Sequence, residues 1–270
     1  MPWPPCLSVS LSLLSLSLVS PALGAPGGAL SFLALGDWGG LPEPPFVTPR
    51  QVATAAAMGR AAAELGGDFV LALGDNFYYE GVKDEWDPRF QDTFERVFVS
   101  PGLRGVPWFV MAGNHDHAGN VTAQLRYSRH SPRWYGRDTG SPRVPKCPRG
   151  SPRVRCGHGQ VRYGQVRQGQ TGVTGTGEHR VSAYLCGRDH NLQYLEEGGV
   201  AYVLSGAGNF MEESRPHERS VPPGALRFFY GSPESPGGFA HVRLEPRGAT
   251  VTFLESTGRV LHRVTLPPRL

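Results

Sequence analysis

Apolar runs that end in short polar strings recur along the first half of the chain. The runs cover residues 31–35, 68–73 and 107–112, and each is followed at once by Gly-Asp or Gly-Asn. Between the first two runs, an alanine-rich segment begins at Thr48, with proline next, and ends at Gly66. Threonine followed by proline is typical of the start of a helix, and glycine is typical of its end, so this segment is predicted to be a helix. The order of strands and helix predicts an α/β fold with a parallel sheet.

A second helix is predicted at residues 87–99, where phenylalanines recur on one face. After residue 181 the pattern changes to alternation, beginning with a strand at 183–186. Further alternating runs lie at residues 202–208, 225–230, 238–244, 250–255 and 260–266. Because Gly and Pro turns separate these runs, they favour a second sheet with antiparallel strands.

The stretch at about residues 128–180 differs from both halves. Ser-Pro-Arg recurs in it three times, and no apolar period of 2 or 3.6 residues is sustained. Such a stretch buries too little apolar surface to offset chain entropy, so it is predicted to be disordered or an aberrant insert. Residues 126–180 carry eleven arginines and one lysine against two acidic residues, a net charge of about +10.

This positive charge leaves a polyanion-binding module open as an alternative function for residues 128–180. Its few aromatic side chains, Trp134, Tyr135 and Tyr163, do not form a stacking platform for single-stranded nucleic acid. No specific nucleic-acid partner is therefore expected.

Residues 1–24 have the pattern of a secretory signal peptide. An apolar run at residues 7–19 precedes the small residues Ala22 and Gly24, although the first five residues carry no basic side chain. The run is too short to span a bilayer comfortably, and no later run is longer, so no membrane span is expected. Residues 25–270 are expected to form one domain, secreted or lysosomal.

The sequon that begins at Asn120 predicts a glycan there, on a surface loop of a secreted protein. Cys186 is expected to be a small buried residue within its strand. A disulfide between Cys147 and Cys156 stays open, because sequence alone does not settle pairing.

The polar strings carry side chains that bind hard metal ions. In an open parallel sheet such groups gather beyond the carboxyl ends of the strands, so the strings are predicted to share one crevice. Carboxylates, a phenol, an amide and imidazoles form a ligand set for iron, manganese or zinc. The candidate residues are Asp37, Asp75, Tyr78, Asn114, His115, His117 and, after a fourth run, His190. The chain is therefore predicted to hold a two-metal site.

Together these strings resemble the signature of the calcineurin-like metallophosphoesterases, GD…GDN…GNHD…GHxH. Tyr78 and the string 183–194 resemble, more narrowly, purple acid phosphatases of the tartrate-resistant type. The resemblance covers residues 31–127 and 181–266 and implies a four-layer αββα sandwich. It also implies a monomeric acid phosphatase that hydrolyses phosphomonoesters or phosphoproteins with a metal-bound hydroxide at a dinuclear iron centre.

Within this resemblance, Fe³⁺ is expected at Asp37, Asp75, Tyr78 and His190. Two neighbouring cations need a shared anion, and Asp75 is expected to bridge them because it follows the middle of the three strands. A phenol such as that of Tyr78 ionises near neutral pH only beside a strongly polarising ion, which favours Fe³⁺.

The histidines beside Asn114 are implied to act in catalysis. His115 is expected to lie next to the phosphate, where it could stabilise charge or assist the leaving group. His117 is the second catalytic candidate, with a purely structural role in the turn as the alternative. Asp116 is expected to orient a neighbouring imidazole.

A second metal, Fe²⁺ or Zn²⁺, is expected to take oxygens from Asp75 and Asn114. The family supplies two further imidazoles, but Arg188 stands where one of them belongs. Arginine has no lone pair to donate and repels cations, so this position is expected to fill poorly. His158 is the candidate for the other imidazole. A catalytically impaired relative with a single iron is thus an alternative.

Related phosphatases build core strands from the part of the chain that corresponds to residues 128–180. Here the segment looks replaced, as a mis-spliced transcript or a faulty gene model would leave it. A natural divergent loop is the alternative.

Overall fold

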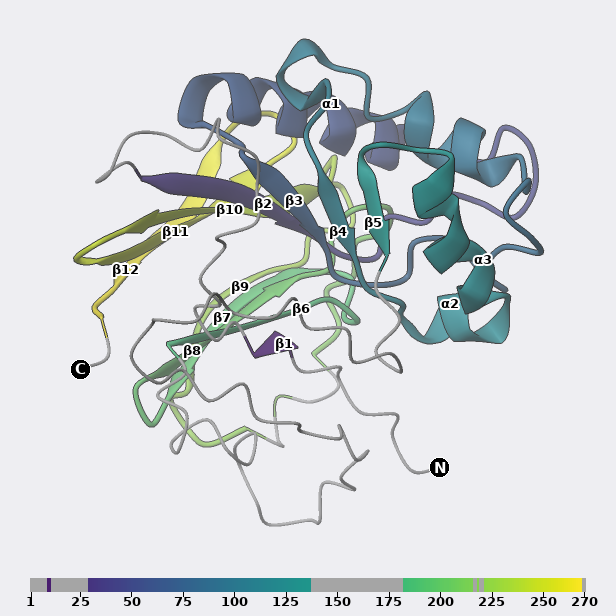
Figure 1. Ribbon diagram of the computed structural model, residues 1–270. Helices are drawn as coiled ribbons and strands as arrows, with labels where there is room; N and C mark the ends of the chain where they lie inside the picture. Colours follow the sequence, from purple (N-terminus) through teal and green to yellow (C-terminus); the bar gives the residue numbers. More distant parts are fainter. Residues whose placement is uncertain (1–8, 11–28, 137–181, 216–217, 219–220, 269–270) are drawn as a thin grey trace, which may run out of the picture.

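Seven strands form the larger of two sheets, in the order β12-β11-β10-β2-β3-β4-β5 (Figure 1). The structure, a computed structural model, describes residues 9–10, 29–136, 182–215, 218 and 221–268. Strands β2 to β5 run parallel, and β10, β11 and β12 continue the sheet as antiparallel strands. The seven strands are β2 (Leu30–Leu35), β3 (Phe69–Ala72), β4 (Trp108–Val110), β5 (Trp134–Gly136), β10 (Gly238–Glu245), β11 (Gly248–Glu255) and β12 (Val260–Leu266).

The smaller sheet has the order β1-β6-β8-β7-β9. Strands β6 and β8 are parallel, whereas the other neighbours are antiparallel. The five strands are β1 (Val9–Ser10), β6 (Ala183–Cys186), β7 (Leu192–Glu197), β8 (Val200–Ser205) and β9 (Leu226–Tyr230). Removal of residues 1–24 as a signal peptide would take β1 away and leave β6 at the edge.

Helix α1 begins and ends where its capping residues predict. Thr48 Oγ1 accepts a hydrogen bond of 3.1 Å from the backbone N–H of Gln51, and Pro49 occupies the first turn. Within the predicted helix at residues 87–99, the segment Phe90–Glu95 is π-helical instead of a regular α-helix. The helical segments are α1 (Pro49–Leu65), η1 (Phe90–Glu95), η2 (Pro101–Leu103), α2 (Asn114–Ala118), α3 (Val121–Arg126) and η3 (Tyr127–Arg129).

Side chains along the central strands point alternately to the two faces of the large sheet, so the core consists of two clusters. Leu33 and Leu35 of β2 face α1 and η1 in one cluster, which includes Met58. Phe32 and Ala34 face the smaller sheet in a second cluster. The described residues therefore form three layers, helices, large sheet and small sheet, and supply no helix on the outer face of the small sheet. The described residues do not test the fourth layer of the expected αββα sandwich.

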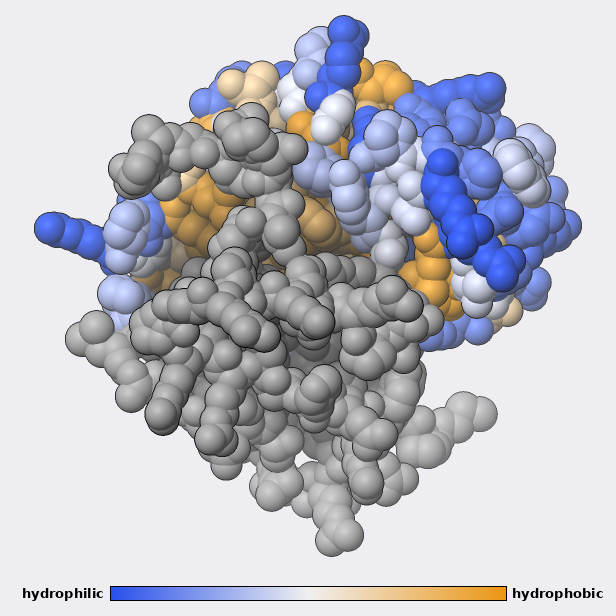
Figure 2. Space-filling model, in the orientation of Figure 1, coloured by the Kyte–Doolittle hydropathy of each residue, from blue (hydrophilic) through white to orange (hydrophobic). Residues whose placement is uncertain are grey.

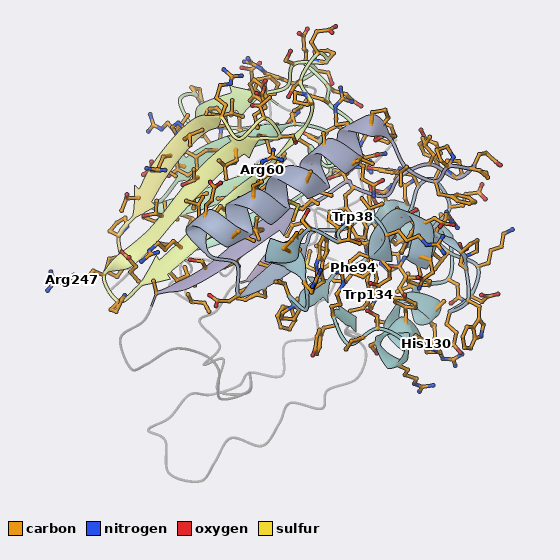
Figure 3. All side chains as sticks on the ribbon, turned by 90° about the horizontal axis from the view of Figure 1, so that it is seen from above. Trp38, Arg60, Phe94, His130, Trp134 and Arg247 are labelled. Carbon is orange, nitrogen blue, oxygen red and sulfur yellow. The ribbon has the colours of Figure 1, made fainter. Side chains whose placement is uncertain are left out.

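Large aromatic side chains fill the space between the helical layer and the large sheet. Trp38, Phe94 and Trp134 lie together beside α1 (Figure 3), and all three are at most 1% exposed. The Phe94 ring centroid lies 4.9 Å from that of Trp134 and 5.1 Å from that of Trp108. Such a cluster buries far more apolar area than aliphatic residues at the same positions would.

The surface differs between the two sides of the molecule. Figure 2 shows hydrophobic residues gathered at the level of β2, β10 and β11, whereas the side formed by α2 and α3 is mostly hydrophilic. No helix among the described residues combines the length and hydrophobicity needed to cross a membrane.

The structure corrects two sequence predictions. Strands β10, β11 and β12 belong to the first sheet, pairing through β10 and β2, and the second sheet contains a parallel pair. The predicted disordered stretch also begins too early. Trp134–Gly136 forms β5, which pairs with β4, because Trp134 is buried in the aromatic cluster. The predictions for residues 1–8, 11–28 and 137–181, including Cys147, Cys156 and His158, lie outside the described residues.

Candidate metal centre

The carboxyl ends of β2, β3 and β4 lie side by side because these strands pair in register. Leu35 pairs with Ala72, and Ala72 pairs with Val110. The backbone N–H of Asp37 donates to the carbonyl of Gly74 at 3.0 Å, so the first two polar strings touch directly. The sheet thus gathers the three strings at one edge, as the position rule for parallel sheets requires.

The two sheets also meet at this edge. Ser205, the last residue of β8, accepts a 2.7 Å hydrogen bond from the Gly36 N–H, and its hydroxyl donates to the Ala34 carbonyl at 2.8 Å. The segment that follows β6 therefore lies over the end of β2. It delivers Arg188, whose backbone N–H donates to Asp37 Oδ2 at 2.7 Å, and His190.

Asp37, Tyr78 and His190 bring three donor atoms together. The Tyr78 hydroxyl oxygen lies 3.2 Å from Asp37 Oδ1 and 3.2 Å from His190 Nε2. His190 Nε2 lies 3.7 Å from Asp37 Oδ1. Ligand atoms around a metal with bonds of about 2 Å are separated by about 3 Å, so this triangle has the dimensions of a coordination site.

The buried acidic side chains of this triangle also favour the binding of a cation. Asp37 is 1% exposed and Tyr78 is fully buried. Burial, and then the charge of Asp75, raises the pKa of Asp37 well above its usual range. Burial, and then the charge of Asp37, raises the pKa of the Tyr78 phenol. The positive charge near these acidic groups is too small to offset their burial, and a bound metal ion would supply more.

Asp75 lies beneath the turn that carries His115. Its Oδ1 accepts a 3.0 Å hydrogen bond from the His115 backbone N–H, and a Cβ on Gly113 would clash with its carboxylate. His115 Nδ1 lies 2.6 Å from the Tyr79 carbonyl. Because a carbonyl only accepts, Nδ1 carries the hydrogen and Nε2 is the atom left to meet a ligand.

Arg188 spans from one string to another. Its guanidinium Nη1 donates to Asn114 Oδ1, while its backbone N–H holds Asp37. The amide oxygen that the sequence assigned to a second metal thus contacts a fixed positive charge. This geometry fits the first predicted metal position and does not fit the second.

Backbone strain is concentrated at the same edge. Four described non-glycine residues have positive φ, and three of them are Asp37 (54°), Asp75 (51°) and Arg188 (93°). Each costs about 1 to 2 kcal/mol relative to the ordinary regions. Such conformations persist where the surroundings over-determine them, which is typical of functional sites.

Comparison with known sequences assigns the fold and the strings to a family. A sequence model of the calcineurin-like phosphoesterases matches residues 30–206. The chain belongs to the calcineurin-like phosphoesterase family. Tartrate-resistant acid phosphatase type 5 of Homo sapiens is 42% identical, over 96% of this chain and 97% of that protein. The Mus musculus protein of the same name is 41% identical, over 91% and 92%.

A more distant relative agrees with the family, and a solved structure agrees with the fold. Purple acid phosphatase 7 of Arabidopsis thaliana is 28% identical over 98% of this chain and 97% of that protein. A solved structure, GAP50 the anchor in the inner membrane complex of Plasmodium, superposes with a TM-score of 0.63 and 19% identity, covering 90% of both chains. The family resemblance and the metallophosphoesterase fold predicted from sequence are confirmed. The human alignment spans 316 positions, more than the 270 residues of this chain, so it includes positions that this phosphoesterase lacks.

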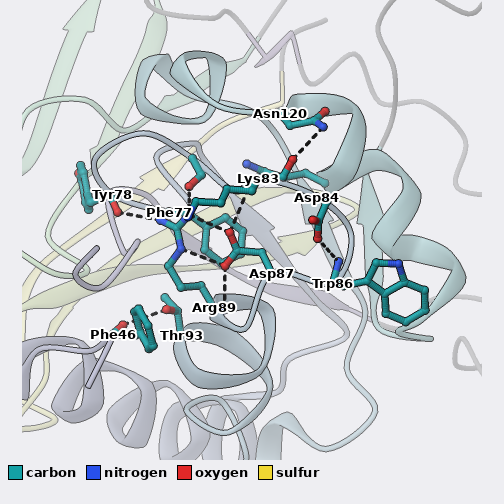
Figure 4. A network of polar contacts seen from close by, with 12 residues as sticks. Phe46, Phe77, Tyr78, Lys83, Asp84, Trp86, Asp87, Arg89, Thr93 and Asn120 are labelled. Atoms are coloured by element: carbon teal, nitrogen blue, oxygen red, sulfur yellow. Dashed lines mark hydrogen bonds and ion pairs between the residues drawn. The ribbon is translucent and has the colours of Figure 1, made fainter. Parts of the chain in front are cut away.

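The loop that carries Tyr78 is held by a network that the sequence analysis missed (Figure 4). Arg89 Nη1 donates to the Tyr78 carbonyl at 3.0 Å, and its Nε and Nη2 donate to Asp87 at 3.1 and 3.0 Å. The Lys83 N–H donates to the same carboxylate at 3.0 Å. Burial acts in the opposite direction, but these hydrogen bonds hold the pKa of Asp87 below its usual value. The only signal in the sequence was an arginine two residues after an aspartate.

Asp116 has a different role from the one predicted. Its carboxylate accepts hydrogen bonds from the backbone N–H groups of Gly113, Asn76 and Phe77 and from the Gln124 amide, instead of orienting an imidazole. Burial raises the pKa of Asp116 to about 6, although these hydrogen bonds act in the opposite direction. The residue therefore ties the second and third strings together.

His190 has a partner that the sequence analysis also missed. Glu212 Oε1 lies 2.7 Å from His190 Nδ1, which leaves Nε2 directed at Tyr78 and Asp37. A carboxylate in this position fixes the orientation of an imidazole ligand. Glu212 follows β8 by seven residues, too far from His190 in sequence to be matched by spacing.

The remaining predicted residues are placed as follows. His117 is exposed on α2, and the structure gives it no contact within the described residues that would assign it to the site. Asn120 is exposed and caps α3, accepting from the Ala123 N–H at 3.1 Å. Among described residues, no group of three or more His, Cys, Asp or Glu side chains could hold a metal alone. The candidate set therefore depends on the Tyr78 phenol.

Proposed function

We propose that this phosphoesterase is an acid phosphatase that hydrolyses phosphate monoesters at an iron centre of the purple acid phosphatase type. The triangle of Asp37, Tyr78 and His190 carries the proposal, because it is a hard-ligand set of suitable size. The names of the relatives support the reaction. Iron would be held by these three residues together with Asp75, and a second metal, Fe²⁺ or Zn²⁺, would have only Asp75 and Asn114.

Each residue of the site has a physical task in this reaction. A bound ion would supply Lewis acidity and activate water as the nucleophile. Asp37 and Asp75 supply negative charge, and Glu212 keeps His190 Nε2 aimed at the same point. His115, with Nδ1 engaged by the Tyr79 carbonyl, offers Nε2 at the turn beside Asn114. When protonated, it can donate to the leaving oxygen.

Replacement of Tyr78 by phenylalanine tests the iron assignment. Purified wild-type chain should contain about one iron and show the visible absorption of an iron–phenolate pair. Tyr78→Phe removes only the oxygen at the corner of the triangle, so the absorption should vanish while the fold is kept. Optical spectra, iron analysis and p-nitrophenyl phosphate hydrolysis at acid pH are the measurements.

Tyr79→Phe is the matched control, because the Tyr79 side chain is 48% exposed and the change removes only its hydroxyl. The ring, whose centroid lies 5.7 Å from that of His115, and the backbone carbonyl that contacts His115 are both kept. It should retain colour and activity. A wild-type chain without iron and without phosphatase activity, or colour that survives in Tyr78→Phe, would contradict the proposal.

Two alternatives have less support. A catalytically impaired protein with a single iron is favoured by the contact between Arg188 and Asn114, and it predicts iron and colour with negligible turnover. A polyanion-binding module would depend on residues 128–180, most of which lie outside the described residues. No observation favours it.

The secretory pathway follows from the same proposal and gives a separate prediction. The mature chain should begin near Ala25 and carry a glycan on Asn120, whose side chain is exposed. Thr122→Ala removes the sequon but keeps the Asn120 side chain that caps α3. Intact-mass analysis of secreted protein should show the glycan on wild type and none on Thr122→Ala. Retention of Met1 without a glycan would show that the prediction is wrong.

A further inference from the structure

Arg188 places a positive charge at the mouth of the candidate site. Its side chain is exposed, and one guanidinium nitrogen donates to Asn114 Oδ1. Its own backbone N–H donates to Asp37 Oδ2, and a Cβ on the preceding Gly187 would clash with the same carboxylate. The arginine is thus anchored against the carboxylate edge at its backbone and at its side-chain tip.

Arg188 keeps these contacts although its backbone conformation is strained. Arg188 has φ of 93°, a region that side-chain-bearing residues rarely adopt. The guanidinium contacts the amide oxygen that a second cation would take, so its positive charge occupies that position.

The guanidinium group of Arg188 is also chemically suited to bind a phosphate group. The group has five N–H donors in a planar fork and cannot lose its charge, and Asn114 occupies one nitrogen. The other donors are available at an exposed position. Forked, charge-assisted hydrogen bonds to phosphate oxygens are the interaction for which this geometry is best suited.

We propose that Arg188 binds the phosphate group of the substrate at the position of a second metal, so that the site works with one metal ion and one arginine. The inference rests on the proposed phosphatase function. Asn114 then holds the guanidinium in place. His115 is the next residue after Asn114 in α2. The fixed charge favours an anionic phosphate monoester over a neutral carboxylate ester.

The test measures binding of inorganic phosphate to the iron-loaded mature chain by isothermal titration calorimetry at fixed salt. Arg188→Gln should weaken binding at least about tenfold, because a charge-assisted hydrogen bond is lost. Arg188→Gly should do the same, and glycine adopts the positive φ without strain, so a folding defect is not expected. Arg188→Lys keeps the charge but not the fork and should be intermediate.

Arg247→Gln is the control. Arg247 is exposed in the turn between β10 and β11, at the end of the sheet opposite the site, because β10 is antiparallel to β2 (Figure 3). It should bind phosphate like wild type. Iron content, measured on every sample, should match wild type throughout the series, and the melting temperature should be no lower than that of wild type.

Phosphate affinity in Arg188→Gln and Arg188→Gly within about twofold of wild type would overturn the inference. Two tightly bound metal ions per wild-type chain would overturn it as well. The proposed function fails separately. A wild type that binds phosphate through Arg188 but does not hydrolyse p-nitrophenyl phosphate contradicts only the phosphatase assignment, whereas turnover with unchanged affinities contradicts only the arginine's role.

Discussion

Asp37→Asn is expected to release the iron and to lower the phosphatase rate by a factor on the order of 10³. Asp37 Oδ1 is the corner of the ligand triangle that carries a full negative charge, and its Oδ2 accepts from the Arg188 backbone. Asparagine keeps the shape and one acceptor but removes the charge. Loss of metal-derived charge stabilisation costs several kcal/mol in the transition state, which corresponds to a rate change of about this size.

Stability distinguishes this result from misfolding. Because burial and Asp75 raise the pKa of Asp37, the carboxylate destabilises the metal-free fold. Metal-free Asp37→Asn should therefore melt at the same temperature as the metal-free wild type or higher, while iron analysis shows the loss of metal. Glu64→Gln, an exposed carboxylate near the end of α1, should change neither property. An Asp37→Asn protein with full iron and normal turnover would refute the assignment.

Phe94→Ala is expected to lower the free energy of unfolding by about 3 to 5 kcal/mol. The side chain is fully buried, and its ring contacts Trp38, Trp108 and Trp134 at centroid distances of 5.9, 5.1 and 4.9 Å. The Arg133 guanidinium lies 4.5 Å from the same ring. Truncation leaves a cavity between η1 and the sheet that rigid aromatic neighbours do not fill.

Urea unfolding of the metal-free mature chain, followed by circular dichroism, measures this change. Trp86→Ala is the control, because it also truncates a large aromatic, but one that is 72% exposed. It should cost less than about 1 kcal/mol. Equal losses for the two variants would show that the aromatic cluster does not hold the helical layer on the sheet.

Local sequence sufficed for the parts of the fold that depend on neighbouring residues. The Thr48 cap and Gly66 predicted the limits of α1, and the apolar runs predicted β2, β3 and β4 to within about two residues. Such features depend on backbone geometry and on the hydrogen bonds of adjacent residues. The π-helical form of residues 90–95 was not predictable, since the phenylalanine spacing also suits an ordinary helix.

The sequence did not reveal to which sheet the last three strands belong. The runs at 238–244, 250–255 and 260–266 alternate in the same way whether they form a new sheet or extend the first. Pairing of His241 with Leu33 decides the matter, and this contact joins residues far apart in the chain. Likewise Trp134 lies in sequence that predicted disorder, but it is buried because Trp38 and Phe94 surround it.

The sequence by itself determined which chemical groups the site contains and the edge of the sheet where they lie. Each group follows a strand directly, and parallel strands end at a common edge. Only the tertiary structure decided which groups touch. It joined Tyr78 to His190 and Arg188 to Asn114 through contacts made when the second sheet packs on the first. It joined Glu212 to His190 through the segments that follow β8 and β6 within the second sheet. Distances between side chains depend on that packing, because no local rule links residues separated by tens of positions.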